Sequence, residues 1–206
     1  MPSNPGITIS MFNHLKGNLE RLSQEIQQML ITIDQRESSV LNEFEELHHL
    51  FHDVQVNAAS YYLRRYLAPF TKQFDVLATA IQHLSQRNHG ALIVIQRNDD
   101  LTRFIHSGVP IHAELSAPLL ESIFYSGNPL HDGAVLVCNN KIVSAANILP
   151  VSNKKVNLKK IGTRHRAALG ISELTDALVL VVSEESGRAT FALGGNLYPI
   201  MTKGLR

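Results

Sequence analysis

Only one cysteine, Cys138, occurs among the 206 residues, so the chain cannot form an internal disulfide. Long apolar runs are missing as well, and none approaches the roughly 20 residues that a helix needs to span a bilayer. The N-terminal stretch MPSNPGITIS lacks the basic segment and apolar core of a signal peptide. These absences favour a cytoplasmic protein that has no membrane partner.

Signatures of the common nucleotide-binding loops are also absent. Neither GxxxxGK[ST] nor GxGxxG occurs, and no GxSxG marks a nucleophilic serine. Cys138 follows an apolar segment, which is unlike the surroundings of a nucleophilic thiolate. A Ser/His/Asp triad stays open, although nothing in the sequence marks one.

A strong overall charge is the third feature that the chain lacks. The formal net charge is only +1, so nucleic acid is not expected as a partner. The charges are unevenly placed, because residues 1–60 carry a net charge of −5 and residues 61–206 a net charge of +6. This asymmetry indicates an acidic arm and a basic body that could hold an anionic ligand.

The N-terminal quarter has the pattern of a helical hairpin. Apolar residues recur every three or four positions from Leu15 to Ile33 and again from Val40 to Val54, and Ser38-Ser39 interrupts the pattern. We therefore predict an all-α region over residues 1–55. It either packs on itself or on the body, or it acts as an assembly and control element. The histidines of this region, His48, His49 and His52, are interpreted as solvent-facing rather than as metal ligands.

Residues 56–206 alternate between helical and strand-like patterns. Strands are predicted over 91–95, 134–137, 141–149, 177–182 and 189–193, and helices over 61–67, 74–84, 117–125 and 163–174. Residues 101–110 are predicted to be irregular, with a turn at 108–110. The pattern predicts an α/β fold, in which a mixed central β-sheet is flanked by helices and preceded by the helical hairpin.

Polar residues stand directly before a buried strand in the stretch LHDGAVLV, residues 130–137. His131 and Asp132 offer an imidazole and a hard oxygen ligand, and a divalent ion bound to phosphates takes only one or two protein groups. Gly133 leaves room for another group to approach the backbone. The alternative is an aspartate that caps a turn beside a core histidine.

A second charged group lies at the predicted start of a helix, in Thr163-Arg164-His165-Arg166. Free N–H groups of a first helical turn attract anions, and guanidinium groups match phosphate oxygens. Four lysines of the preceding loop, Lys154, Lys155, Lys159 and Lys160, add positive charge. The stretch is therefore a candidate polyphosphate site, although a basic surface helix would have the same sequence. Glu184 is a second available carboxylate if its strand lies beside the first.

These two motifs resemble the paired DGA and RHR motifs of the diadenylate cyclases, the family with a DAC or DisA-N domain. Further pieces occur in the same order, namely Gly90–Val94, Asn147–Pro150 and Ser183–Gly187, and the resemblance covers about residues 60–200. The acidic two-helix arm resembles that of the soluble, sporulation-type member.

The resemblance implies a fold with a mixed sheet and an enzyme that condenses two ATP into cyclic di-AMP and two pyrophosphates. It also implies a divalent metal ion, Mn²⁺ or Mg²⁺, and a homo-oligomer in which two protomer sites face each other. The catalytic residues it implies are Asp132, Arg164 and Arg166. The nucleotide-binding residues would be Gly133, Ala134, Leu149, Thr163, Arg164, His165, Arg166 and Ser183, and the metal ligands Asp132, His131 and Glu184.

Two other functions are compatible with the same motifs. A non-catalytic sensor of ATP or cyclic di-AMP would use the same phosphate site, but it would not need Asp132. A metal-dependent phosphoesterase is disfavoured because the carboxylates are too few for a two-metal site. If the enzyme is a cyclase, residues 1–55 are expected to inhibit it by holding an assembly in which the sites are turned apart.

Overall fold

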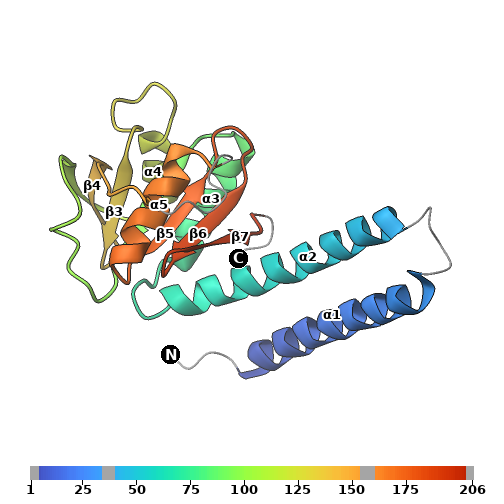
Figure 1. Ribbon diagram of the computed structural model, residues 1–206. Helices are drawn as coiled ribbons and strands as arrows, with labels where there is room; N and C mark the ends of the chain where they lie inside the picture. The colour runs from blue at the N-terminus through green and yellow to red at the C-terminus, as the bar shows by residue number, and fades with distance from the viewer. Residues whose placement is uncertain (1–4, 34–39, 154–160, 203–206) are drawn as a thin grey trace. The chain divides into compact units, whose positions relative to one another are not determined.

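The computed structural model describes residues 5–33, 40–153 and 161–202 (Figure 1). The chain divides into two compact units, Met1–Tyr61 and Tyr62–Arg206. Within the described ranges, no helix carries a stretch that is both long and apolar enough to cross a bilayer.

The first unit is built from helix α1 (Pro5–Thr32) and most of helix α2 (Val40–Leu67), which confirms the predicted hairpin. Among the residues of this unit whose burial the structure describes, few are buried: Leu15, Met29, Val54 and Ala59. The prediction that α2 ends near Val54 and that a new helix covers 61–67 was wrong. The intervening residues contain neither glycine nor proline, so nothing breaks the helix where the apolar spacing changes.

The second unit contains a seven-stranded mixed sheet with the order β2-β4-β3-β1-β5-β6-β7. The strands are β1 (Ala91–Ile95), β2 (Val109–Glu114), β3 (Ala134–Cys138), β4 (Lys141–Asn147), β5 (Leu178–Val182), β6 (Ala189–Leu193) and β7 (Asn196–Ile200). Strand β1 pairs with β3 in parallel and with β5 in antiparallel orientation. The other neighbouring pairs are antiparallel. The predicted α/β fold with a mixed central sheet is confirmed.

Two edge strands were missed by the sequence analysis. Strand β2 replaces the turn predicted at 108–110, and it accommodates Pro110 because an edge strand has a side without ladder hydrogen bonds. Strand β7 follows a two-residue turn in which Gly194 and Gly195 both have positive φ. The turn at Asn139-Asn140 between β3 and β4, which was predicted, also has positive φ at both residues.

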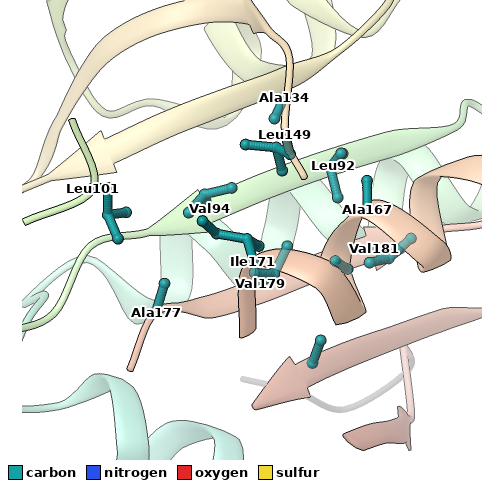
Figure 2. Packing of buried hydrophobic residues seen from close by; sticks show 12 residues of the cluster. Leu92, Val94, Leu101, Ala134, Leu149, Ala167, Ile171, Ala177, Val179 and Val181 are labelled. Atoms are coloured by element: carbon teal, nitrogen blue, oxygen red, sulfur yellow. The ribbon is translucent and has the colours of Figure 1, made fainter. Parts of the chain in front are cut away.

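Helices cover both faces of the sheet. Alternate residues of the central strands, among them Val179 and Val181, pack with Ala167 and Ile171 of α5 (Thr163–Leu174), as Figure 2 shows. Leu180 has the opposite parity and lies with residues of α3 (Phe74–Gln86) and with the last turn of α2. Helix α4 (Ala117–Ile123) packs against α3. Because both faces are covered, the central strands are apolar throughout.

Candidate functional site

The sheet topology brings three of the motifs to one edge. Strands β1 and β3 are parallel, and Ala91 of β1 pairs with Val182 at the end of antiparallel β5. The starts of β1 and β3 and the end of β5 therefore lie together. Three segments adjoin these strand ends and so lie close together. Gly90 directly precedes β1, His131-Asp132-Gly133 directly precedes β3, and the turn that begins at Ser183 directly follows β5.

Arg164, in the first turn of α5, connects these segments. Its Nη1 lies 2.7 Å from Oε2 of Glu184, and its Nη2 donates a hydrogen bond of 3.4 Å to the carbonyl oxygen of His131. The Arg164 side chain is only 21% exposed, so its charge is held in place rather than free in solvent. One guanidinium thus joins the two motifs that the sequence analysis singled out, and it adds the turn with Glu184 as a third part.

Gly90 provides the space that this guanidinium occupies. A Cβ atom at position 90 would stand 2.8 Å from Cζ of Arg164 and 3.0 Å from Cβ of Glu184. Contacts this short force a displacement, so a side chain at position 90 would disturb the ion pair. In the sequence, Gly90 was identified only as part of the resemblance. Its role in spacing the site had no local signal.

Gly133 and Ala134 form a close backbone contact with the end of β4. Gly133 has φ of +113°, and a Cβ there would lie 2.8 Å from the carbonyl carbon of Ala146. Asn147, which is buried, donates a hydrogen bond of 2.7 Å to the carbonyl oxygen of Ala134 and accepts one of 2.9 Å from the Ser144 hydroxyl. Asn147 therefore holds the strand start that carries the HDG segment, which the sequence analysis did not foresee.

Asp132 is exposed, and its carboxylate has no hydrogen-bond or ion-pair partner within the described part of the chain. The ring Nδ1 of the neighbouring His131 lies against the carbonyl oxygen of Asn128, and the backbone N–H of His131 donates a hydrogen bond of 3.0 Å to the same oxygen. Asp132 is thus available to a ligand, whereas the His131 ring is already oriented by its own loop.

A divalent metal ion fits Asp132 better than it fits the full predicted ligand set. Among the described residues, no group of three or more His, Cys, Asp or Glu side chains could hold a metal ion. Glu184 is paired with Arg164, and His131 uses one ring nitrogen for Asn128. A metal that binds mainly through substrate phosphates needs only one or two protein groups, so the exposed carboxylate of Asp132 is sufficient.

The start of α5 carries the remaining residues of the TRHR motif. Gly162 is the N-cap in an extended conformation, and Thr163 and Arg166 are exposed. Burial lowers the pKa of His165, which favours its neutral imidazole. The motif therefore presents an exposed guanidinium, an exposed hydroxyl and the first N–H groups of a twelve-residue helix. The four lysines of the preceding loop lie outside the described residues.

Leu149 and Ser183 lie at different depths. Leu149 is buried within the core cluster between the sheet and α5 (Figure 2). Ser183 is partly exposed, its N–H donates to the carbonyl oxygen of Arg188 at 2.9 Å, and its hydroxyl accepts a hydrogen bond of 3.3 Å from the N–H of Ser186. Ser183 is therefore at the rim of the site, while Leu149 forms part of its packed support.

Comparison with known proteins assigns a counterpart to each unit. The sequence profile described as "DAC: DisA bacterial checkpoint controller nucleotide-binding" matches residues 78–197. The profile described as "Diadenylate cyclase CdaS, N-terminal" matches residues 8–70.

Individual relatives cover nearly the whole chain. The diadenylate cyclase CdaS of Bacillus thuringiensis is 52% identical over 195 residues, which are 95% of this chain and 97% of the relative. The cyclic di-AMP synthase CdaS of Bacillus subtilis is 52% identical over 89% of this chain and 88% of the relative. A crystal structure of a Bacillus cereus protein, described as a hypothetical membrane spanning protein, has a TM-score of 0.78 and 51% identity. It covers 97% of this chain and 100% of that chain.

Proposed function

The chain belongs to the diadenylate cyclase family and is an enzyme of that class, and we propose that it works through two protomer sites that face each other. Each site holds one ATP. The 3′-hydroxyl oxygen of one ATP attacks the α-phosphorus of the other, and a new P–O bond forms. The bond from that phosphorus to the bridging oxygen breaks, and pyrophosphate leaves with the electron pair. Two such transfers give cyclic di-AMP and two pyrophosphates.

The contacts of Arg164 carry this proposal. They join the HDG segment, the start of α5 and the turn with Glu184 at one edge of the sheet. Phosphoryl transfer depends mainly on positioning and on neutralising phosphate charge, and these are the properties that the cluster provides. Asp132, which is exposed, follows the residue whose carbonyl oxygen Arg164 contacts, and the exposed Thr163 and Arg166 belong to the same helical turn as Arg164.

We assign the roles accordingly. Asp132 orients the attacking hydroxyl and helps to accept its proton. Thr163, Arg166 and the first N–H groups of α5 bind the triphosphate, while neutral His165 contributes a hydrogen bond rather than a charge. Arg164 also faces the phosphates and keeps the site assembled. Gly133 and Ala134 form the floor beneath the nucleotide, Ser183 contacts phosphate at the rim, and Leu149 supports the base.

A divalent ion, Mn²⁺ or Mg²⁺, would be held by Asp132, with His131 and Glu184 as further ligands if they leave their present partners. When bound, it would neutralise negative charge on the triphosphate. ATP is the substrate and cyclic di-AMP the product, and the supply of ATP makes the cytoplasm the proposed location.

The direct test is incubation of the full chain with ATP and either metal, followed by mass analysis of the products. We expect cyclic di-AMP and pyrophosphate in a ratio of one to two. Bound but unconverted ATP would indicate a sensor, and release of inorganic phosphate or of linear nucleotides would indicate a phosphoesterase. Either result would refute the proposed reaction.

We further propose that residues 1–55 form a regulatory and oligomerisation region and that residues 56–206 form the cyclase domain. The support is the long two-helix unit, whose apolar residues are largely exposed in the single chain. Two sites have to meet for each product, so a helical arm that fixes the geometry of an assembly also controls the reaction. In this proposal the arm favours an assembly in which the sites are turned apart.

A further inference from the structure

Glu121 of α4 forms a close contact with α3. One carboxylate oxygen, Oε2, accepts a hydrogen bond of 2.8 Å from Nη1 of Arg87, and the other, Oε1, lies 2.8 Å from Nδ1 of His83. The Glu121 side chain is only 16% exposed, whereas those of His83 and Arg87 are 37% and 55% exposed. We call this group of three residues the Glu121 clasp. It fixes α4 to the last turn of α3.

The end of α3 leads directly into the site. Asn88 has φ of +53°, and the N–H of His89 returns to the carbonyl oxygen of Leu84 at 2.9 Å, which closes the helix. The next residue is Gly90, against which Arg164 and Glu184 pack. The position of the last turn of α3 therefore sets the distance between the backbone at Gly90 and the ion pair.

The end of α4 leads to the other half of the site. Tyr125 follows the helix, and its ring forms a T-shaped contact with the His89 ring at a centroid distance of 5.7 Å. The chain then turns at Asn128, whose carbonyl oxygen accepts the N–H of His131. The end of α4 is thus joined to the end of α3 twice, by the clasp and by the contact between the rings of His89 and Tyr125. The HDG segment follows a few residues later.

The same end of α3 also holds the turn that carries Ser183 and Glu184. The Ser85 hydroxyl donates a hydrogen bond to the carbonyl oxygen of Gly187. Gly187 has φ of +66°, and a Cβ there would collide with the carbonyl oxygen of Ser85. Two of the three parts that Arg164 joins, the HDG segment and the turn with Glu184, are therefore anchored at the last turn of α3 and the residues that follow it.

We propose that Glu121 is a positioning residue of the cyclase site. By clasping the last turn of α3, it keeps the HDG segment and Gly90 in register with the Arg164–Glu184 pair. The proposal rests on the proposed function, because it assigns Glu121 to the same site. Glu121 itself makes no hydrogen bond or ion pair with the residues assigned to ATP in the described chain. Its effect on the reaction is transmitted through the two loops.

Two substitutions of similar size separate positioning from simple stabilisation. Glu121→Gln keeps an oxygen that accepts from Arg87 and gains an amide that donates to a neutral His83, whereas Glu121→Leu keeps the bulk and loses both contacts. In the full chain with ATP and Mn²⁺, we expect Glu121→Leu to lower kcat by about tenfold with little change in KM, since small displacements of reacting groups cost rate. Glu121→Gln should restore kcat to within about threefold of the wild type.

The matched control is Glu114→Gln, which removes an exposed Glu–Lys pair of 3.6 Å between β2 and β4. It should leave kcat unchanged. Amide hydrogen exchange supplies a readout that needs no turnover: Glu121→Leu should accelerate exchange in 86–90 and 125–133, and Glu114→Gln should not. This comparison tests the clasp even if the wild type makes no cyclic di-AMP, a result that would refute only the proposed function.

Wild-type kcat in folded Glu121→Leu, or equal losses in the Gln and Leu variants, would overturn the proposal. If Glu121→Leu does not fold, Arg87→Met replaces it, because it removes the hydrogen bond to Glu121 Oε2 from the other side of the clasp, at a side chain that is 55% exposed. It should lower kcat more than it raises KM, and unchanged kcat would overturn the proposal equally.

Discussion

The two units of this chain differ in how far their apolar side chains are buried. In the second unit, every residue of strands β1 and β5 is at most 3% exposed. In the first unit, several large apolar side chains are mostly open to solvent, such as Leu30 at 68%, Ile31 at 71% and Leu41 at 80%. Others that are at least 40% exposed in this unit are Phe12, Leu19, Ile26, Ile33, Phe44 and Phe51.

This difference indicates where each unit obtains its stability. Burying a side chain such as leucine contributes about 1.5–3 kcal/mol relative to leaving it exposed. The sheet unit buries its apolar side chains within one chain, because helices cover both faces of the sheet. The helical unit leaves many of its apolar side chains exposed in one chain, so they do not contribute this free energy there. We therefore expect the helical unit to pack against another copy, while the proposed site lies in the sheet unit.

The largest effect should follow from a change in the sheet unit alone. Asp132→Asn removes the charge of an exposed carboxylate and should lower cyclic di-AMP formation by at least about 100-fold, since charged groups at phosphoryl-transfer sites contribute on this scale. The loss should be the same with and without residues 1–55. Because Asp132 is exposed, thermal unfolding should be nearly unchanged. A rate within a few-fold of the wild type would remove its assigned role.

A pair of glycine substitutions compares the two units directly. Gly90→Ala places a Cβ against Arg164 and Glu184 and should lower kcat by about tenfold through displacement of the ion pair. Gly17→Ala, in the middle of α1, meets no atom within 4 Å. It should leave kcat unchanged and stabilise the helix by about 0.5–1 kcal/mol. Steady-state kinetics and melting curves measure both variants, and equal kinetic effects would contradict the division of roles.

Deletion of residues 1–55 should raise turnover several-fold if the arm holds the sites apart. Leu63 and Leu67 remain in the truncated chain, and both are buried within the second unit, so its packing is retained. Turnover per protomer and sedimentation velocity should be measured together, since a smaller assembly with higher activity is the expected pair of results. A folded truncation with unchanged or lower activity would count against autoinhibition.

Single substitutions on the arm should change assembly more than stability. Leu41→Glu and Ile31→Glu introduce charges where the side chains are already exposed in one chain. The melting temperature should move little, but the sedimentation coefficient should fall if these side chains are buried between copies. Leu174→Glu is the control, because Leu174 of α5 is 55% exposed in the other unit. An unchanged assembly in all three variants would refute the proposed role of the arm.

Most helices and strands could be predicted from the sequence, but the contacts between them could not. Apolar spacing identified α1, α3, α5 and the central strands, because each buries a regular face or is buried entirely. Strand β2 escaped because it is an edge strand with exposed residues and a proline. The two charged motifs were identified by residue type. Their connection through Arg164, the space at Gly90 and the Glu121 clasp depend on strand order and helix packing, which leave no local pattern.

The smallest expected effect concerns a histidine in each unit. Burial lowers the pKa of His165 in the folded chain below its ordinary value of 6.5. Between that lowered pKa and pH 6.5, the unfolded chain therefore binds more protons than the folded chain. The resulting stability is full above pH 6.5 and is lost as the pH falls towards the folded-state pKa.

His165→Gln should remove this dependence, whereas His52→Gln, at an exposed position of the arm, controls for the loss of one imidazole. Urea unfolding of each variant at pH 7.5 and 5.5 measures the difference. If wild type and His165→Gln lose equal stability between these two values, His165 is not held neutral by burial, and its assignment as an uncharged hydrogen-bonding group for the triphosphate fails.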